Sequence, residues 1–386
     1  MAVRLGIIGF GAEGGMYTKL LTEGRVPQMS LGAICDIDES KRAGAEAVGV
    51  PFFVDYHDLL SSGTVDAVVT TVPHYLHPQI GIAALDQGLH VLLEKPVGVY
   101  TRQARRVIDH AATRPDLVTG VFFNQRTNPL YIDLKRLLDS GELGRLRHTC
   151  WIITTWYRPQ GYYEQSAWRA TWGGEGGGVL VNQAPHQLDL WQWLCGVPKK
   201  VFAKCVFGFQ RDIVVEDEVN AVVDFGDGVT GHFLTSTSDL VGTDRLEILC
   251  DQGKVVVEDS STVTITRLTQ SERELSDNAG MDFVRELFTG KLDRDQLMSV
   301  ETREYSSVWG EQHAEVLRNF AAAVESGGQL LAPAADGIHG VRLANAMHLS
   351  SWLDREVSIE DFDEDAYLVE LNRRIAAEGL FPQREE

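Results

Sequence analysis

The chain has 386 residues, 44% hydrophobic and 23% charged, which excludes disordered and fibrous proteins and favours two domains. Its net charge of −20 disfavours a nucleic acid as partner, and no apolar run approaches the ~18 residues that a membrane helix needs. The N-terminal apolar run ends at Gly9 and is too short for a signal peptide, so we expect a cytoplasmic protein. The five cysteines are widely spaced and include no CxxC pair, so we expect reduced thiols and no metal site.

The first 121 residues alternate short β-branched runs with helical patterns. We expect strands at residues 4–8, 31–37, 65–72, 91–94 and 118–123. Helical patterns at residues 12–23, 40–47, 80–87 and 102–112 separate them. This alternation predicts βαβ units and a parallel sheet.

Beyond residue 121 the pattern changes to that of a largely antiparallel sheet. A helix at residues 130–140 precedes strands at residues 146–157, 201–210, 219–225, 229–236, 244–250, 254–258 and 263–268. Helical patterns return at residues 311–325, 337–354 and 363–377. We therefore predict an α/β domain over residues 1–121 and an α+β domain over residues 122–386. This leaves open whether the C-terminal helices pack back on the first domain.

A glycine-rich loop follows the first predicted strand directly. It reads Gly9-Phe10-Gly11-Ala12-Glu13-Gly14, a GxGxxG in the position that binds a dinucleotide in Rossmann domains. Asp36 ends the second strand, 22 residues after Gly14, where a carboxylate accepts from the ribose hydroxyls. We predict that these seven residues bind NAD. NADP is the less favoured cofactor, kept open by Lys41 and Arg42.

Aromatic and polar residues gather between residues 151 and 172. Aromatic faces beside convergent hydrogen-bonding groups suit a ligand that is apolar on its C–H face and polar at its edges, such as a sugar or cyclic polyol. The candidate substrate contacts in this segment are Tyr157, Arg158, Tyr163, Trp168, Arg169 and Trp172. The competing interpretation places these aromatic side chains in the core.

Two residues are candidates for proton transfer and charge stabilisation. His186 follows Pro185 at a predicted helix start, where the helix dipole favours a neutral imidazole that can move a proton. We expect it at an exposed edge, oriented by Asn182 and contacted by Asp189, and giving a pH–rate limb near 6.5. Lys95 ends the fifth strand, at the sheet edge where ligands bind.

These motifs together resemble the Gfo/Idh/MocA family of glucose–fructose oxidoreductases and inositol dehydrogenases. The resemblance rests on the glycine loop, Asp36, Thr71-Val72-Pro73…His77, Glu94-Lys95-Pro96 and Gly176-Gly177-Gly178…His186-Gln187-Leu188-Asp189. It implies a Rossmann domain before an α+β domain with an open antiparallel sheet, and Lys95 and His186 beside the transferred hydride. Many members carry Asp where this chain has Asn182. Further candidate contacts are Pro73, His74, His77, Glu94 and Lys95 for the cofactor, and Lys95, Asn124, Arg126, Asn182 and His186 for the substrate.

The resulting functional prediction is an NAD-dependent oxidoreductase that acts on a secondary hydroxyl of a sugar, glycoside or cyclic polyol. His186 would move the hydroxyl proton and Lys95 would stabilise the alkoxide. The alternative is a glycoside hydrolase that uses tightly bound NAD in a transient oxidation, elimination, hydration and reduction. A non-catalytic nucleotide sensor is a third class, disfavoured by the presence of both Lys95 and His186.

Self-assembly is also expected, as a homodimer or homotetramer through the C-terminal sheet. The alternating side chains Leu246, Ile248, Cys250, Val255 and Val257 have no obvious covering helix nearby in the sequence. We therefore expect a second subunit to cover them.

Overall fold

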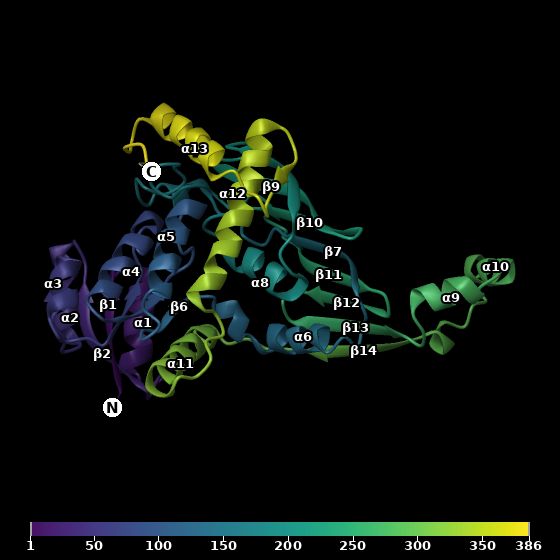
Figure 1. The fold of residues 1–386 in the computed structure, drawn as a ribbon, viewed down its shortest axis with the longest axis horizontal. Coiled ribbons are helices and arrows are strands. Elements are labelled where there is room, and N and C mark those ends of the chain that lie inside the picture. Colours follow the sequence, from purple (N-terminus) through teal and green to yellow (C-terminus); the bar gives the residue numbers. More distant parts are fainter. Residues whose placement is uncertain (1, 385–386) are drawn as a thin grey trace.

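The computed structural model describes residues 2–384, which form two β-sheets lying side by side with helices around and between them (Figure 1). The first sheet is parallel, with the strand order β3-β2-β1-β4-β5-β6. Its strands are β1 (Val3–Ile8), β2 (Met29–Cys35), β3 (Phe52–Phe53), β4 (Ala67–Thr70), β5 (His90–Leu93) and β6 (Thr119–Val121). The order reverses between β1 and β4, where Rossmann domains bind their ligands. The predicted α/β fold is confirmed.

Helices connect these strands and cover the parallel sheet. They are α1 (Ala12–Thr22), α2 (Arg42–Ala47), α3 (Tyr56–Ser61), α4 (His77–Asp86) and α5 (Thr101–Ala112), with short 3-10 turns η1 (Glu39–Lys41) and η2 (His74–Leu76). The turn η3 (Asn124–Thr127) leads out of the sheet into α6 (Pro129–Asp139). The loops after β1, β4 and β5 therefore meet at one edge of the sheet.

The second sheet has nine strands in the order β14-β13-β12-β11-β7-β10-β9-β8-β15. All neighbours are antiparallel except β7 and β10. The strands are β7 (Leu146–Ile153), β8 (Lys200–Phe207), β9 (Glu216–Gly226), β10 (Val229–Ser236), β11 (Asp244–Cys250), β12 (Gly253–Glu258), β13 (Thr262–Leu268), β14 (Met298–Glu304) and β15 (Val357–Ser358). Two further helices of this part are α7 (Gln160–Tyr163) and α8 (Pro185–Cys195).

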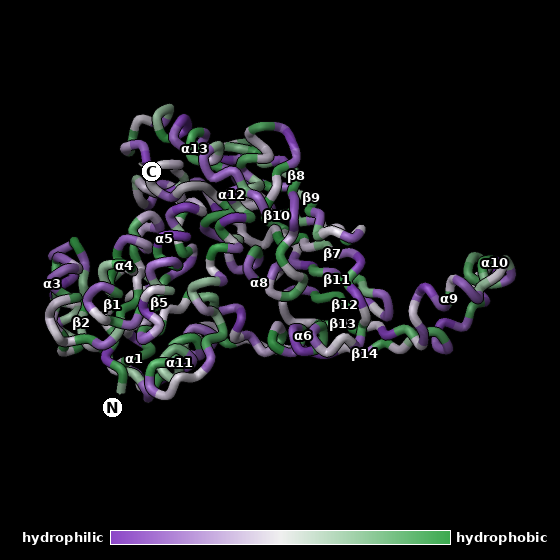
Figure 2. Tube along the Cα trace, in the orientation of Figure 1, coloured by the Kyte–Doolittle hydropathy of each residue, from purple (hydrophilic) through white to green (hydrophobic). Residues whose placement is uncertain are grey.

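One face of the second sheet forms the largest apolar core of the chain. The side chains of Leu246, Ile248, Cys250, Val255 and Val257 are at most 3% exposed within this single chain. Our expectation that a second subunit covers them is therefore wrong, because the helical side of the same chain already does. Figure 2 shows hydrophobic and hydrophilic residues alternating along the strands of this region, as expected where one face of a sheet is buried.

The opposite face of this sheet lies open. Phe202, Val222, His232, Cys150 and Glu247 are register partners across five neighbouring strands and occupy this face. Phe202 is 45% exposed and Val222 is 43% exposed. The predicted open antiparallel sheet is thus present, with its apolar surface on other residues than expected.

The C-terminal part of the chain returns to the first domain. Residues of α11 (Glu311–Ser326) join the core cluster of β1, and residues of α12 (Gly337–Leu353) join that of β6. Between them, the turn η5 (Ala334–Asp336) follows a backbone pairing in which Val121 N–H donates to Ala332 O at 2.9 Å. The helix α13 (Glu364–Glu378) then packs beside α12.

Residues 269–297 form an arm between β13 and β14 that projects from the far edge of the second sheet (Figure 1). The arm holds α9 (Glu272–Asn278), α10 (Met281–Thr289) and the turn η4 (Arg294–Gln296), and none of the three contains a buried residue. In the part of the chain that the structure describes, no helix has the length and apolar character needed to cross a membrane.

Candidate active site

The glycine loop lies between β1 and α1, and its shape fits a dinucleotide. Gly9 has φ +101°, and an added Cβ would lie 2.3 Å from the Thr71 carbonyl oxygen. An added Cβ at Gly14 would lie 2.1 Å from the Gly9 carbonyl oxygen, so packing requires both glycines. Gly11 is different, because a Cβ there would meet no protein atom within 4 Å. Gly11 caps α1 without a side-chain hydrogen bond, which leaves open space and free amides for a diphosphate.

Asp36 lies at the end of β2 with its carboxylate already partly engaged. It accepts from the backbone N–H of Phe10 at 2.7 Å and from that of Asp38 at 2.9 Å. The Lys41 ammonium lies 2.7 Å from the same oxygen that Phe10 contacts. The carboxylate is therefore fixed beside the glycine loop, with a lysine next to it that sequence reasoning kept as an option for NADP.

Glu94 and Lys95 follow β5 at the same edge of the sheet. The Glu94 carboxylate is buried, accepts from the Tyr17 hydroxyl, and accepts from the Lys95 backbone N–H at 2.9 Å. Burial raises the pKa of Glu94 to about 7. The Lys95 ammonium donates to the Asn182 backbone carbonyl oxygen at 3.0 Å, which links the two domains.

His186 begins α8, one residue after Pro185 at the first helical position, as predicted. Its side chain is half-buried, whereas we expected it at an exposed edge. Burial lowers its pKa well below the usual range, and the positive charge of Lys95 acts in the same direction. The predicted limb near pH 6.5 is therefore a wrong assignment for this residue. Burial therefore keeps the ring neutral, and its Nδ1 is buried with no hydrogen-bond partner among the described residues.

Asn182, expected to orient His186, and Asp189, expected to contact it, are both engaged elsewhere. The Asn182 side-chain amide donates to the Glu175 carboxylate and, at 3.3 Å, to the Tyr162 hydroxyl. The Asp189 carboxylate is 2.6 Å from Arg126 in an ion pair that is almost completely buried. Neither side chain forms a hydrogen bond with His186 within residues 2–384.

His313 is a site residue that the sequence analysis missed. It lies near the start of α11, and its Nε2 is 2.9 Å from the side-chain amide of Asn124. Burial lowers its pKa to about 4, with the Lys95 charge acting in the same direction. Trp309, 83% exposed, lies beside the His313 ring at a centroid distance of 5.4 Å. Gly310, the N-cap of α11, is the one local signal near His313 in the sequence. The contact between Asn124 and His313 joins residues 189 positions apart, so no local pattern predicts it.

Tyr162, Trp168, Arg158 and Arg169 form a polar aromatic wall in the second domain. The Arg158 and Arg169 guanidinium groups lie 5.1 and 4.6 Å from the centre of the Tyr162 ring. Trp168 packs edge-on against His74 across the domain boundary, at a centroid distance of 5.8 Å. These cations and ring faces make the wall suitable for a hydroxylated ring, including one with an anionic substituent.

Several predicted site residues are structural instead. His77 is 1% exposed, and both of its ring nitrogens face main-chain carbonyls at 2.8 Å. Arg126 is 3% exposed, with its donors taken by Asp189, Asp336 and Leu331 O. Each has no group left for a ligand, so these two assignments are wrong.

Two aromatic residues of the predicted substrate segment are also core residues. Trp172 is 3% exposed and donates to Val214 O at 3.1 Å. Tyr163 is 8% exposed and donates to Thr237 at 3.0 Å. The core interpretation holds for both. Tyr157 lies at the rim, 37% exposed with Arg211 over its ring, and Pro73 and His74 lie in the loop after β4.

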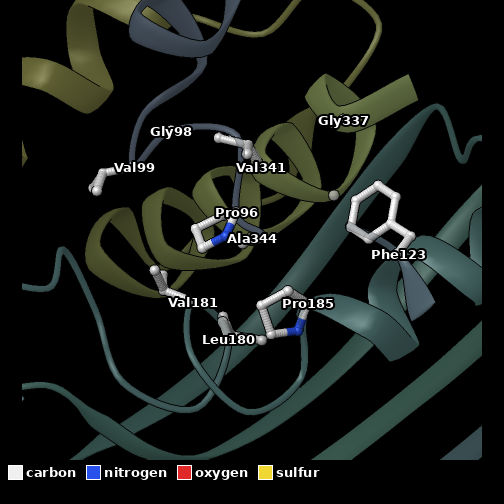
Figure 3. Close-up of a pocket in the computed structure, with 11 residues that line it drawn as sticks. Pro96, Gly98, Val99, Phe123, Leu180, Val181, Pro185, Gly337, Val341 and Ala344 are labelled. Atoms are coloured by element: carbon white, nitrogen blue, oxygen red, sulfur yellow. The ribbon is translucent and has the colours of Figure 1, made fainter. Parts of the chain in front are cut away.

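An apolar cavity lies between the loops that carry Pro96 and Pro185 and the helix α12 (Figure 3). Pro96 and Pro185, the neighbours of Lys95 and His186, line it together with Phe123, Val341 and Ala344. No charged side chain lines this cavity, so it offers no ionic partner to a polar substrate.

Comparisons with known proteins find matches to both parts of the chain. Residues 3–122 match the model of an oxidoreductase family with an NAD-binding Rossmann fold, and residues 131–256 match that of the GFO/IDH/MocA C-terminal domain. Inositol 2-dehydrogenase 1 of Saccharopolyspora erythraea is 33% identical over 147 residues, which are 37% of this chain and 43% of that enzyme. The chain thus spans less than half the length of this curated relative.

Two further proteins match over nearly the whole chain. The scyllo-inositol 2-dehydrogenase (NADP(+)) IolW of Bacillus subtilis is 24% identical, covering 93% of this chain and 96% of that enzyme. The WlbA dehydrogenase of Bordetella pertussis, solved in complex with NADH and UDP-GlcNAcA, has a TM-score of 0.74 at 22% identity, covering 93% of this chain and 99% of that one. The likeness to the solved structure shows a common fold.

Proposed function

The chain belongs to the Gfo/Idh/MocA oxidoreductase family, and from that premise we propose that it transfers a hydride between NAD and a secondary hydroxyl of a sugar or cyclic polyol. The observation that carries the proposal is the contact of the Lys95 ammonium with the Asn182 backbone oxygen at 3.0 Å, four residues before the neutral His186. Lys95 and His186 come from different domains, and the charge of Lys95 reaches the His186 ring. In alcohol oxidation an uncharged base can take the hydroxyl proton and a cation can stabilise the alkoxide.

The mechanism follows from the charge states of these two residues. NAD, held by residues 9–14 and Asp36, would supply the hydride acceptor. His186, kept neutral by burial, accepts the hydroxyl proton while the carbinol carbon loses its hydride. The Lys95 ammonium stabilises the negative charge that develops on the substrate oxygen. In the reverse direction His186 returns the proton to the reduced carbonyl.

The substrate class follows from the wall opposite. The Tyr162 and Trp168 rings hold the Arg158 and Arg169 guanidinium groups by cation–π contacts, and these guanidinium groups offer donors to the oxygens of a sugar or cyclitol. The inositol dehydrogenases among the relatives support a cyclic polyol. None of the relatives described above is a glycosidase by name.

A panel of myo-inositol, scyllo-inositol, glucose and glucuronate, each with NAD or NADP, tests the proposal. We expect at least one of these four compounds to yield free reduced cofactor. The absorbance of the reduced cofactor measures the reaction. Hydrolysis of a nitrophenyl glycoside without release of reduced cofactor would contradict the oxidoreductase proposal and support the NAD-dependent glycosidase.

Asp36→Ala is expected to weaken NAD binding by at least about tenfold, the effect of losing a hydrogen bond to a charged group. The preference should also relax towards NADP, because the Lys41 ammonium, 2.7 Å from Asp36, would be free to meet a 2′-phosphate. Pairing Asp36→Ser with Ile37→Arg should extend the change. Calorimetric titration with both cofactors measures it, and unchanged NAD affinity in both variants would rule out the ribose contact.

We also propose that the chain forms a homodimer or homotetramer through the open face of the second sheet. Phe202 and Val222 are register neighbours on this face and are both more than 40% exposed. Val222→Glu is expected to dissociate the assembly at micromolar concentration, as measured by light scattering. Phe209→Glu, on a loop and 71% exposed, is the matched control that should remain assembled. A wild-type chain that is monomeric under these conditions contradicts the proposal.

A further inference from the structure

Glu175 is a buried carboxylate behind the polar aromatic wall, and the mechanism above leaves it without a role. It is 2% exposed. Its Oε2 accepts from the Ala170 backbone N–H at 2.7 Å, and its Oε1 contacts the side-chain amide of Asn182. Asn182 in turn accepts the Lys95 ammonium on its backbone oxygen at 3.0 Å. Glu175 is therefore one residue removed from the reacting groups.

The hydrogen-bonding pattern distinguishes the two oxygens of this carboxyl group. A backbone N–H can only donate, so Oε2 must remain an acceptor in both charge states. The oxygen that gains a proton is therefore Oε1, the one that faces Asn182. Ionised Glu175 requires the Asn182 amide nitrogen at this contact, and protonated Glu175 requires its carbonyl oxygen.

We propose that ionised Glu175 is a positioning residue that turns the Asn182 amide so that its Oδ1 faces the cleft as an acceptor for a substrate hydroxyl. Within the described residues the amide nitrogen donates to Glu175 and Tyr162, whereas no hydrogen bond reaches Oδ1. Asn182 is half-buried, and its backbone already contacts Lys95. The inference rests on the proposed function, and it assigns the site to ligands that donate a hydroxyl proton at this point.

The charge of Glu175 depends on pH close to neutrality because its carboxyl group is buried. Burial raises the pKa of Glu175 to about 7, with the hydrogen bond from Ala170 opposing the rise. The titratable and charged groups around the contact are Arg169, Glu216, Tyr162, Tyr163, His74 and Lys95. His74 stays neutral because burial lowers its pKa well below the usual range, and Tyr163 stays neutral because burial raises its pKa to about 12. Glu94 is the other buried carboxyl near the site with a pKa of about 7, so a Glu175 variant must separate the two.

Glu175→Gln tests the inference because it imitates the protonated form at every pH. Its carbonyl oxygen would stay on the Ala170 N–H, and its amide nitrogen would then face Asn182 and turn that side chain round. We expect KM for the polyol to rise about tenfold at pH 8, the effect of one lost hydrogen bond, with kcat changed less. In the wild type, KM should rise as the pH falls through about 7, and in the variant this dependence should disappear.

Three further measurements separate positioning from a general structural role. In a double-variant cycle, Asn182→Ala should raise KM alone but add little to Glu175→Gln, because both remove the same acceptor. The difference infrared spectrum of wild type and Glu175→Gln should show a carboxylic acid carbonyl band that grows between pH 8 and pH 6. The variant should melt no lower than wild type at pH 8, because a buried charge has been replaced by a neutral isostere.

The inference is overturned if Glu175→Gln keeps the wild-type KM and its pH dependence, or if the two substitutions act additively. If the chain hydrolyses the nitrophenyl glycoside without releasing reduced cofactor, the proposed function is wrong and the infrared titration judges Glu175 alone. A carbonyl band that does not change between pH 8 and pH 6 then overturns the inference.

Discussion

Replacing His186 with alanine is expected to lower turnover on the true substrate by about 10²–10⁴-fold, the range of a lost general base. The wild-type ring is kept neutral by burial and by the charge of Lys95, and its Nδ1 has no protein partner. The protein loses little in folding by the change, since Pro185 and not His186 starts the helix. Turnover, NAD affinity and melting temperature should be measured on one preparation.

The control for this substitution is His57→Ala, a solvent-exposed histidine of α3 that should leave all three quantities unchanged. Added imidazole should partly restore the turnover of the His186 variant. The contrary outcome is a variant that melts earlier but keeps its activity per folded molecule, which would make His186 structural. Because burial depresses the pKa of His186, any limb of the wild-type profile near pH 7 belongs to another group.

Replacing Lys95 with alanine is expected to lower turnover by at least about 10²-fold with little change in NAD affinity. The ammonium is the positive charge nearest to the developing alkoxide in the proposed mechanism. It also lowers the pKa values of His186 and His313, so its removal should raise both. Steady-state kinetics and a histidine NMR titration measure the two effects.

Lys135→Ala is the matched control for Lys95, because it removes a lysine whose contacts are an i,i+4 ion pair with Asp139 on α6 and a cation–π contact with Trp193. It should leave turnover and both histidine titrations unchanged. A Lys95 variant with wild-type turnover would end its assignment, whatever the histidines do.

Local patterns carried the prediction of the first domain. The glycine loop and Asp36 are separated by one helix and one strand, so spacing alone places them together. Strands β3 and β15 escaped notice because each has two residues. Strand β14 was not predicted because its sequence is polar. It lies at the edge of the sheet and contains no buried residue, so it shows no apolar alternation.

The candidate site was harder to predict because burial is decided by distant residues. Arg126 looks like a ligand-binding arginine in the sequence, but its partner Asp189 lies 63 positions away and takes its charge. Trp168 and Trp172 have similar neighbours in the sequence, yet Trp172 is buried in the core and Trp168 packs against His74. His313 reaches the site only through the return of α11, which no local pattern shows.

That return has a consequence for how the chain folds. The sheet of the first domain buries Ala314, Leu317 and Phe320 of α11 against β1, about 310 positions earlier in the chain. Contacts of such separation close slowly, because the loop entropy is lost before the contact stabilises the fold. A ribosome must therefore complete the second sheet before the nucleotide-binding sheet can bury its own core. An excised fragment of residues 1–122 would expose that apolar face, and we expect it to aggregate where the full chain folds.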